Sequence, residues 1–148
     1  RIGIWGLTFK PHTDDIRCAP ALDIITKLLE HGAEIIVYDP AGMHHVENIF
    51  GKKLTYATNA LQVLVYAHAL LLLTEWEEFL AFNETEFVIL KDRVIFDGRN
   101  CLNAERIRKS GVEYYAIGRQ VIAGDAFHVA DLPLFDHVAQ NTKNEINL

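Results

Sequence analysis

Two hydrophobic patterns alternate along the chain: short continuous runs and stripes with helical spacing. Residues 69–74 form an almost continuous apolar run, which is typical of a parallel strand covered on both faces. Residues 20–31 instead place apolar side chains at i, i+3, i+4 and i+7, the spacing of a helix with one buried face. Gly32 follows at the position where a helix commonly ends. The alternation of the two patterns predicts an α/β fold.

The predicted elements follow one another in a regular order. Thr58 is expected to cap one helix, and Gly111 is expected to end another. Strands that alternate with helices through short connections predict a doubly wound, mainly parallel sheet in a single domain. We expect strands at residues 1–5, 34–38, 54–57, 69–74, 94–97 and 112–117, helices at 20–31, 58–67 and 103–110, and one or two short helices within 75–90.

The regular pattern fades beyond Gly118. We therefore expect the folded domain at residues 1–119 and a C-terminal tail at residues 120–148. One short helix is predicted in this tail, around residues 134–140, and the end of the tail is polar.

Composition narrows the class of partner. The 148 residues suit one domain, and the net charge of −6 argues against nucleic acids and anionic membrane surfaces, because both select a basic face. No apolar run approaches the roughly 18 residues of a membrane-spanning helix. Cys18 and Cys101 fit no metal-binding spacing and are interpreted as reduced thiols of a cytoplasmic protein. Because the chain opens on Arg1 rather than Met, we expect it to be a piece of a longer protein.

Candidate chemistry lies where the predicted strands end, because parallel sheets bind ligands beyond the carboxyl ends of their strands. The segment at residues 6–19 is 14 residues long, whereas a strand-to-helix loop usually takes about two to six. It and the segments 74–76 and 97–100 carry three cations, Lys10, Arg17 and Arg99. These could bind phosphate, for which Arg supplies a rigid fork. The two arginines could equally pair with Asp14, Asp15 or Asp97.

Other candidate sites are weaker. Gly3 and Gly6 give only part of the Gly-x-Gly-x-x-Gly fingerprint, and Asp39 lies 33 positions after Gly6 instead of about 20. We therefore assign no nicotinamide site to the chain and interpret Asp39 as the cap of a strand end. His44 and His45 are interpreted as a loop pair without a nearby third ligand, so no metal site is expected. No catalytic residue is assigned, since neither cysteine has a visible base.

Several segments occur together in one order. They are GLTFKPHTDDIR at residues 6–17 with PALDI at 20–24, VYDP at 37–40, LTEWEEF at 73–79, IFDGRN at 95–100 and YYAIGR at 114–119. In this order and spacing they resemble the C-terminal, UDP-sugar-binding domain of UDP-glucose 6-dehydrogenases. The family commonly has Arg-Glu-Ser-Pro where this chain has Arg17-Cys18-Ala19-Pro20. Ala19 lacks the capping oxygen of Ser, at a typical cost of about 1 kcal/mol.

The resemblance implies a Rossmann-like fold and oxidation of UDP-glucose to UDP-glucuronate with two NAD. Phe9, Lys10 and Arg99 would contact the UDP-sugar, and Arg17 would reach NAD held mainly by an N-terminal domain outside this chain. The catalytic cysteine also belongs to a segment that the chain lacks, so the chain is expected to bind UDP-glucose or UDP without catalysis. The rest of the enzyme and further copies in a homo-oligomer are the implied protein partners. A GDP-mannose or UDP-N-acetylhexosamine dehydrogenase, and a non-catalytic nucleotide-binding module, are the alternatives.

Overall fold

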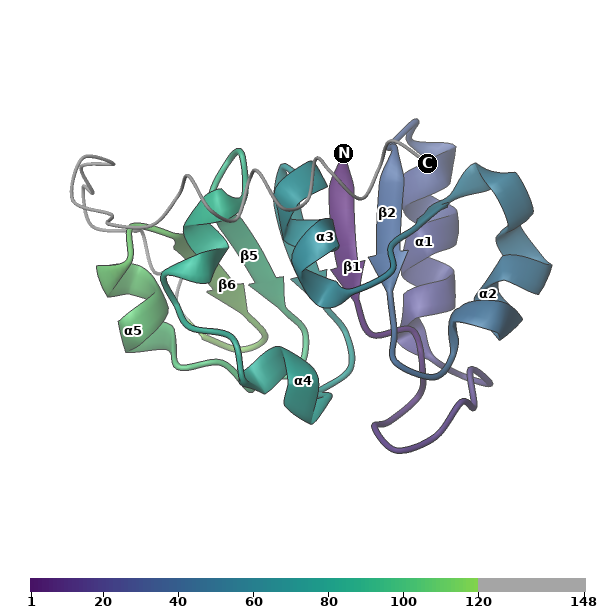
Figure 1. The fold of residues 1–148 in the computed structure, drawn as a ribbon, viewed down its shortest axis with the longest axis horizontal. Coiled ribbons are helices and arrows are strands. Elements are labelled where there is room, and N and C mark those ends of the chain that lie inside the picture. Colours follow the sequence, from purple (N-terminus) through teal and green to yellow (C-terminus); the bar gives the residue numbers. More distant parts are fainter. Residues whose placement is uncertain (120–148) are drawn as a thin grey trace.

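The computed structural model describes residues 1–119 and places six strands in one sheet (Figure 1). The strand order is β3-β2-β1-β4-β5-β6, and every neighbouring pair is parallel. This confirms the predicted doubly wound, Rossmann-like α/β fold. The strands are β1 (Ile2–Trp5), β2 (Ile35–Tyr38), β3 (Thr55–Tyr56), β4 (Ala69–Leu72), β5 (Val94–Asp97) and β6 (Glu113–Ala116).

Helices cover both faces of the sheet, with α3, α4 and α5 in front of it and α1 behind it in Figure 1. Each face has its own apolar core, one around Trp5 and Phe79 and the other around Ile4 and Ile25. No helix in the described residues is long and apolar enough to cross a membrane. The helices are α1 (Pro20–Glu30), α2 (Met43–Phe50), α3 (Ala60–Tyr66), α4 (Glu77–Leu80) and α5 (Ala104–Lys109), with short 3-10 helices η1 (Gly51–Lys53) and η2 (Glu86–Ile89).

Two local predictions were wrong. The segment around His44 and His45 is helix α2 rather than a loop. Met43, Val46 and Phe50 lie at i, i+3 and i+7 and pack on the core, but the helix has only eight residues, which is short for recognising the spacing in the sequence. The cap of α3 is Asn59 rather than Thr58, since the Asn59 side chain accepts a hydrogen bond from the backbone N–H of Gln62. The predicted tail at residues 120–148, with its short helix, lies outside the described residues.

The start of α1 agrees with the sequence. Ala19 takes the N-cap position without a side-chain hydrogen bond, and Pro20 occupies the first turn, where its missing N–H costs nothing. The helix therefore depends on packing, and its buried residues Ala21 and Ile25 face the sheet core.

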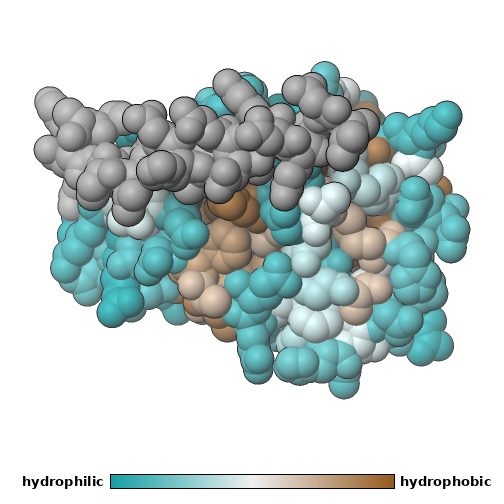
Figure 2. Space-filling view, in the orientation of Figure 1, coloured by the Kyte–Doolittle hydropathy of each residue, from teal (hydrophilic) through white to brown (hydrophobic). Residues whose placement is uncertain are grey.

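Apolar surface is not confined to the two cores. In Figure 2 a hydrophobic area lies in the middle of the face, between α3 and α5, and the surface over α5 beside it is hydrophilic. On the α1 side, a groove of about 630 Å³ runs over strands β4 to β6. Phe96 and Ile117 line this groove and are 42% and 69% exposed. The described helices therefore leave part of that sheet face open.

Candidate functional site

The three segments singled out in the sequence meet at one edge of the sheet. Strands β1, β4 and β5 are neighbours and run in the same direction, so their carboxyl ends lie side by side at the lower edge of Figure 1. The long loop at residues 6–19 follows β1 there. The strand order reverses between β1 and β4: the chain adds β2 and β3 on one side of β1 and then β4, β5 and β6 on the other. Ligands bind at this reversal point in open α/β sheets. The predicted convergence is confirmed.

A buried carboxylate, that of Asp39 at the end of β2, organises this edge. Its side chain is 1% exposed and accepts six hydrogen bonds of 2.7–3.2 Å. A buried anion is tolerated only when its oxygens are fully hydrogen-bonded. Asp39 thereby fixes two neighbouring loops and one aromatic ring in place. The donors are the backbone N–H groups of Leu7, Thr8, Ala41 and Gly42, the Thr8 hydroxyl and the Trp76 indole N–H.

The same arrangement argues against NAD at the β1 turn. A ribose-binding acid must offer its oxygens to the ligand, whereas both oxygens of Asp39 are already occupied inside the protein. Gly6 has a φ of +89°, and a Cβ there would lie 2.4 Å from the backbone nitrogen of Thr74. Gly6 therefore serves the close packing of the β1 loop on the β4 loop. The residues of this turn do not fit a dinucleotide.

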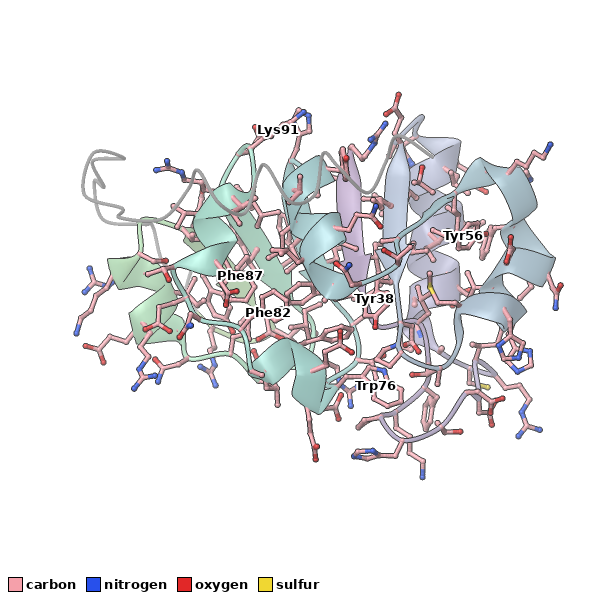
Figure 3. All side chains as sticks on the ribbon, in the orientation of Figure 1. Tyr38, Tyr56, Trp76, Phe82, Phe87 and Lys91 are labelled. Carbon is pink, nitrogen blue, oxygen red and sulfur yellow. The ribbon has the colours of Figure 1, made fainter. Side chains whose placement is uncertain are left out.

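Further contacts tie the β1–α1 loop to the segment after β4. The Thr74 hydroxyl donates a 2.6 Å hydrogen bond to the backbone oxygen of Thr8. Farther along the loop, the His12 ring meets the edge of Trp76 at 5.7 Å, and His12 Nε2 lies 3.8 Å from a Glu77 oxygen. Trp76 is labelled at this lower edge in Figure 3. These contacts hold the β1–α1 loop in a fixed position against the segment after β4.

Phe9 and Lys10 lie on this loop with exposed side chains. Phe9 is 51% exposed, although its backbone N–H donates to the backbone oxygen of Asp15. Lys10 is also exposed, and no ion pair of the described residues involves it. An exposed aromatic ring and a cation therefore stand next to each other on a loop whose backbone is held.

The two arginines are each held by a carboxylate. Arg17 donates through Nε and Nη2 to Asp15, at 2.9 and 2.7 Å, and this pairing lowers the pKa of the Asp15 carboxyl to about 2. Arg99 pairs with Glu75, where its Nη2 donates at 2.8 Å, and this hydrogen bond lowers the pKa of Glu75. Asp97, one candidate partner of Arg99, accepts only its backbone N–H. Glu75 was missed because it lies 24 positions away in the sequence.

Asp97 is a second buried carboxylate, at the end of β5. It is 1% exposed and accepts the backbone N–H groups of Cys101 and Leu102 and the hydroxyl of Tyr114. Burial and the nearby Asp97 raise the pKa of the Cys101 thiol to about 12. A thiol that stays protonated is a poor nucleophile, so Cys101 is structural.

Asp14 stands near the histidine pair of α2. Its Oδ2 atom lies 3.2 Å from Nε2 of His45, and His44 is close to both residues. The interpretation that this pair has no third ligand nearby was therefore wrong.

The parallel sheet, the long loop at its reversal point and the cations on loops at the same edge define a nucleotide-binding class of α/β domain. Residues 3–104 match the UDP-binding domain of the UDP-glucose/GDP-mannose dehydrogenase family, and the chain belongs to this family.

Individual relatives agree with the family. The chain is 39% identical over 127 residues to the UDP-glucose 6-dehydrogenase TuaD of Bacillus subtilis (strain 168), covering 83% of the chain and 27% of TuaD. A UDP-glucose dehydrogenase structure from Pyrobaculum islandicum matches 84% of the chain and 25% of its own length, with a TM-score of 0.63 and 26% identity. The UDP-N-acetyl-mannosamine dehydrogenase Cap5O from S. aureus matches 79% of the chain and 25% of its own length, with a TM-score of 0.56 and 28% identity. The chain spans about a quarter of the length of these relatives.

The role of Asp39 gives a prediction about stability. Asp39→Ala leaves six donors without their acceptor, and we expect the free energy of unfolding to fall by at least about 3 kcal/mol. Urea unfolding measures this change. Glu30→Gln, at an exposed position of α1, is the control and should stay within about 0.5 kcal/mol of the parent. Equal stability of the two variants would contradict the role of Asp39.

The Asp15–Arg17 pair gives a prediction about pH. Because the folded protein depresses the pKa of Asp15 from 3.8 to about 2, the pair stabilises the loop above pH 4, and its contribution is lost as pH falls through about 2. Arg17→Gln should return the pKa of Asp15 toward 3.8. Carboxyl carbon chemical shifts, followed by NMR across this range, measure both values. An unchanged titration in the variant would show that Arg17 is not the cause.

Proposed function

We propose that the chain is the nucleotide-sugar-binding domain of an NAD-dependent UDP-glucose 6-dehydrogenase. The observation that carries the proposal is the exposure of Phe9, Lys10 and Arg99 on loops at one edge of the sheet, after β1 and after β5. Family membership and the names of the relatives support UDP-glucose as the substrate.

Each residue has a chemistry suited to a UDP-sugar. The exposed ring of Phe9 offers an apolar face to a base or sugar, and Lys10 offers an exposed ammonium to phosphate. Arg99 uses Nε and one N–H of Nη2 on Glu75, so the N–H groups of Nη1 stay available for a phosphate oxygen. Glu75 holds the guanidinium plane while the ligand binds its free edge.

Arg17 has a different role in the proposal. Its side chain is 87% exposed, and the residue lies shortly before α1. We assign it to NAD that is bound mainly by the rest of the enzyme. Arg17 reaches outward from this domain, in keeping with the lack of fit between the β1 turn and a dinucleotide.

The oxidation itself belongs to the complete enzyme. There, UDP-glucose would be converted to UDP-glucuronate, a precursor of polysaccharides, with reduction of two NAD. This domain would contribute binding and orientation of the nucleotide sugar and no nucleophile, since Cys101 is held as a protonated thiol beside Asp97. The proposal also includes that the complete enzyme is cytoplasmic and forms a homo-oligomer.

A related substrate is the second candidate. Similarity to the UDP-N-acetyl-mannosamine dehydrogenase Cap5O, at 28% identity, supports an N-acetylhexosamine sugar on the same nucleotide. The higher identity of 39% to TuaD favours glucose.

Calorimetric titration of the chain with UDP, UDP-glucose, UDP-N-acetylglucosamine and GDP-mannose tests the proposal. UDP-glucose and UDP should bind, GDP-mannose should bind more weakly, and absorbance should show no NADH formation when NAD is added. Absence of UDP binding, or turnover by the chain alone, would contradict the assigned role. A preference for UDP-N-acetylglucosamine would select the second candidate.

Arg99 gives a prediction about substrate affinity. If its free N–H groups bind a phosphate, Arg99→Ala should cost about 1.5–3 kcal/mol of UDP-glucose binding. Arg99→Lys should recover only part of this loss, because the fork is absent. The matched control is Lys91→Ala, which removes a cation at the opposite edge of the sheet (Figure 3). Calorimetry on the three variants measures the effect, and equal losses for Arg99→Ala and Lys91→Ala would contradict it.

Lys10 and Arg17 give a prediction that separates the two ligands. In the complete enzyme, Lys10→Ala should raise the Michaelis constant for UDP-glucose more than that for NAD, and Arg17→Ala should do the reverse. Both constants and the melting temperature are measured for each variant. If Arg17 only steadies the loop through Asp15, its loss would lower the melting temperature and weaken both ligands alike.

A further inference from the structure

Three metal-binding side chains converge beside the nucleotide loop. Asp14 comes from the loop itself, and His44 and His45 come from the first turn of α2. One ligand atom from each of the three lies within 4.8 Å of those of the other two. Among the described residues, no other three His, Cys, Asp or Glu side chains meet in this way.

The distances suit a small divalent cation. Zn²⁺ binds nitrogen and oxygen ligands at about 2.0–2.2 Å, so neighbouring ligand atoms of a tetrahedral site are about 3.3–3.5 Å apart. Nε2 of His45 and Oδ2 of Asp14 are already 3.2 Å apart, and the two imidazole rings are 3.8 Å apart between centroids. The ligand atoms of the three residues lie within 4.8 Å of one another, and the side chains of His45 and Asp14 are 41% and 60% exposed, which leaves them free to rotate into the shorter spacing.

Charge and space around the cluster favour the same ion. Asp14 and Asp15 carry two negative charges, and Arg17 cancels one of them through its pair with Asp15. A cavity of about 460 Å³ borders Asp14 and His45, which leaves room for water at an open coordination position. Two imidazoles and one carboxylate select Zn²⁺ and similar transition metals over Mg²⁺ and Ca²⁺, which prefer oxygen ligands alone.

We propose that Asp14, His44 and His45 form a binding site for a divalent transition-metal ion of the Zn²⁺ class. The ion bridges the middle of the β1–α1 loop to the start of α2. Because Phe9, Lys10 and Arg17 lie on the same loop, the bound ion restrains the segment that carries them. The site itself does not depend on the identity of the nucleotide ligand.

Calorimetric titration of the chain with Zn²⁺ alone tests the site. One ion should bind per chain, and Mg²⁺ at the same concentration should not compete. His44→Ala, His45→Ala and the isosteric Asp14→Asn should each weaken Zn²⁺ binding at least about tenfold, the loss seen even for outer-shell changes at metal sites. Circular dichroism without metal should match the parent, because all three positions lie at the surface.

Two control variants separate this site from chance binding. His68 forms a similar pair with Asp92, at 3.3 Å, but no third ligand of the described residues joins it, so His68→Ala should leave Zn²⁺ affinity unchanged. Cys18→Ser, which removes the exposed thiol of the same loop, should also leave it unchanged. Loss of the ion in either control, or full affinity in His45→Ala, would overturn the proposal.

Hydrogen exchange tests the restraint on the loop. Zn²⁺ should slow amide exchange across residues 12–17 in the parent and in Cys18→Ser, and should leave it unchanged in His45→Ala. Binding of Zn²⁺ with no change in exchange would overturn the proposed bridging role. Loss of UDP-glucose binding with Zn²⁺ binding intact would count against the proposed function and leave the metal site standing.

Discussion

The carboxylate of Asp39 is the interaction on which the functional edge depends. It is a buried charge, and its six hydrogen-bond donors among the described residues are all neutral N–H and O–H groups. Hydrogen bonds to an ionised acceptor are roughly twice as strong as neutral ones, so they can offset the loss of hydration. The donors come from three separate segments, after β1, β2 and β4. One side chain thereby sets the relative positions of three loops.

Asp97 repeats this arrangement at the end of β5. It gathers the backbone N–H groups that follow its own strand, and it anchors the hydroxyl of Tyr114 from β6. The chain therefore uses a buried aspartate at a strand end twice, and each one holds a loop that carries a proposed ligand contact, Lys10 in one case and Arg99 in the other. The side chains of Asp39 and Asp97 are buried against donors of the protein, whereas the side chains of Lys10 and Arg99 are exposed to solvent.

The sequence was sufficient for features that depend on local patterns. The apolar runs located the strands, the stripe at residues 20–31 located α1, and the unusual length of the 6–19 segment indicated the site. Features that depend on distant residues left no such signal. Asp39 meets donors 31 to 37 positions away, and Glu75 meets Arg99 across 24 positions. Helix α2 was missed for a different reason: Met43, Val46 and Phe50 do have helical spacing, but the helix has only eight residues, fewer than the window over which such spacing is recognised.

The pairing of the arginines bears on how an acidic chain would present the proposed site for an anion. With a net charge of −6, the chain has no long-range field to attract polyanions. Exposed ion pairs such as Arg17–Asp15 add little stability, but they fix the guanidinium plane before a ligand arrives. Fixing the donors in advance reduces the entropy lost on binding. Recognition at the proposed site would then depend on the geometry of a few donors at short range, which suits a small phosphate ester better than a nucleic acid.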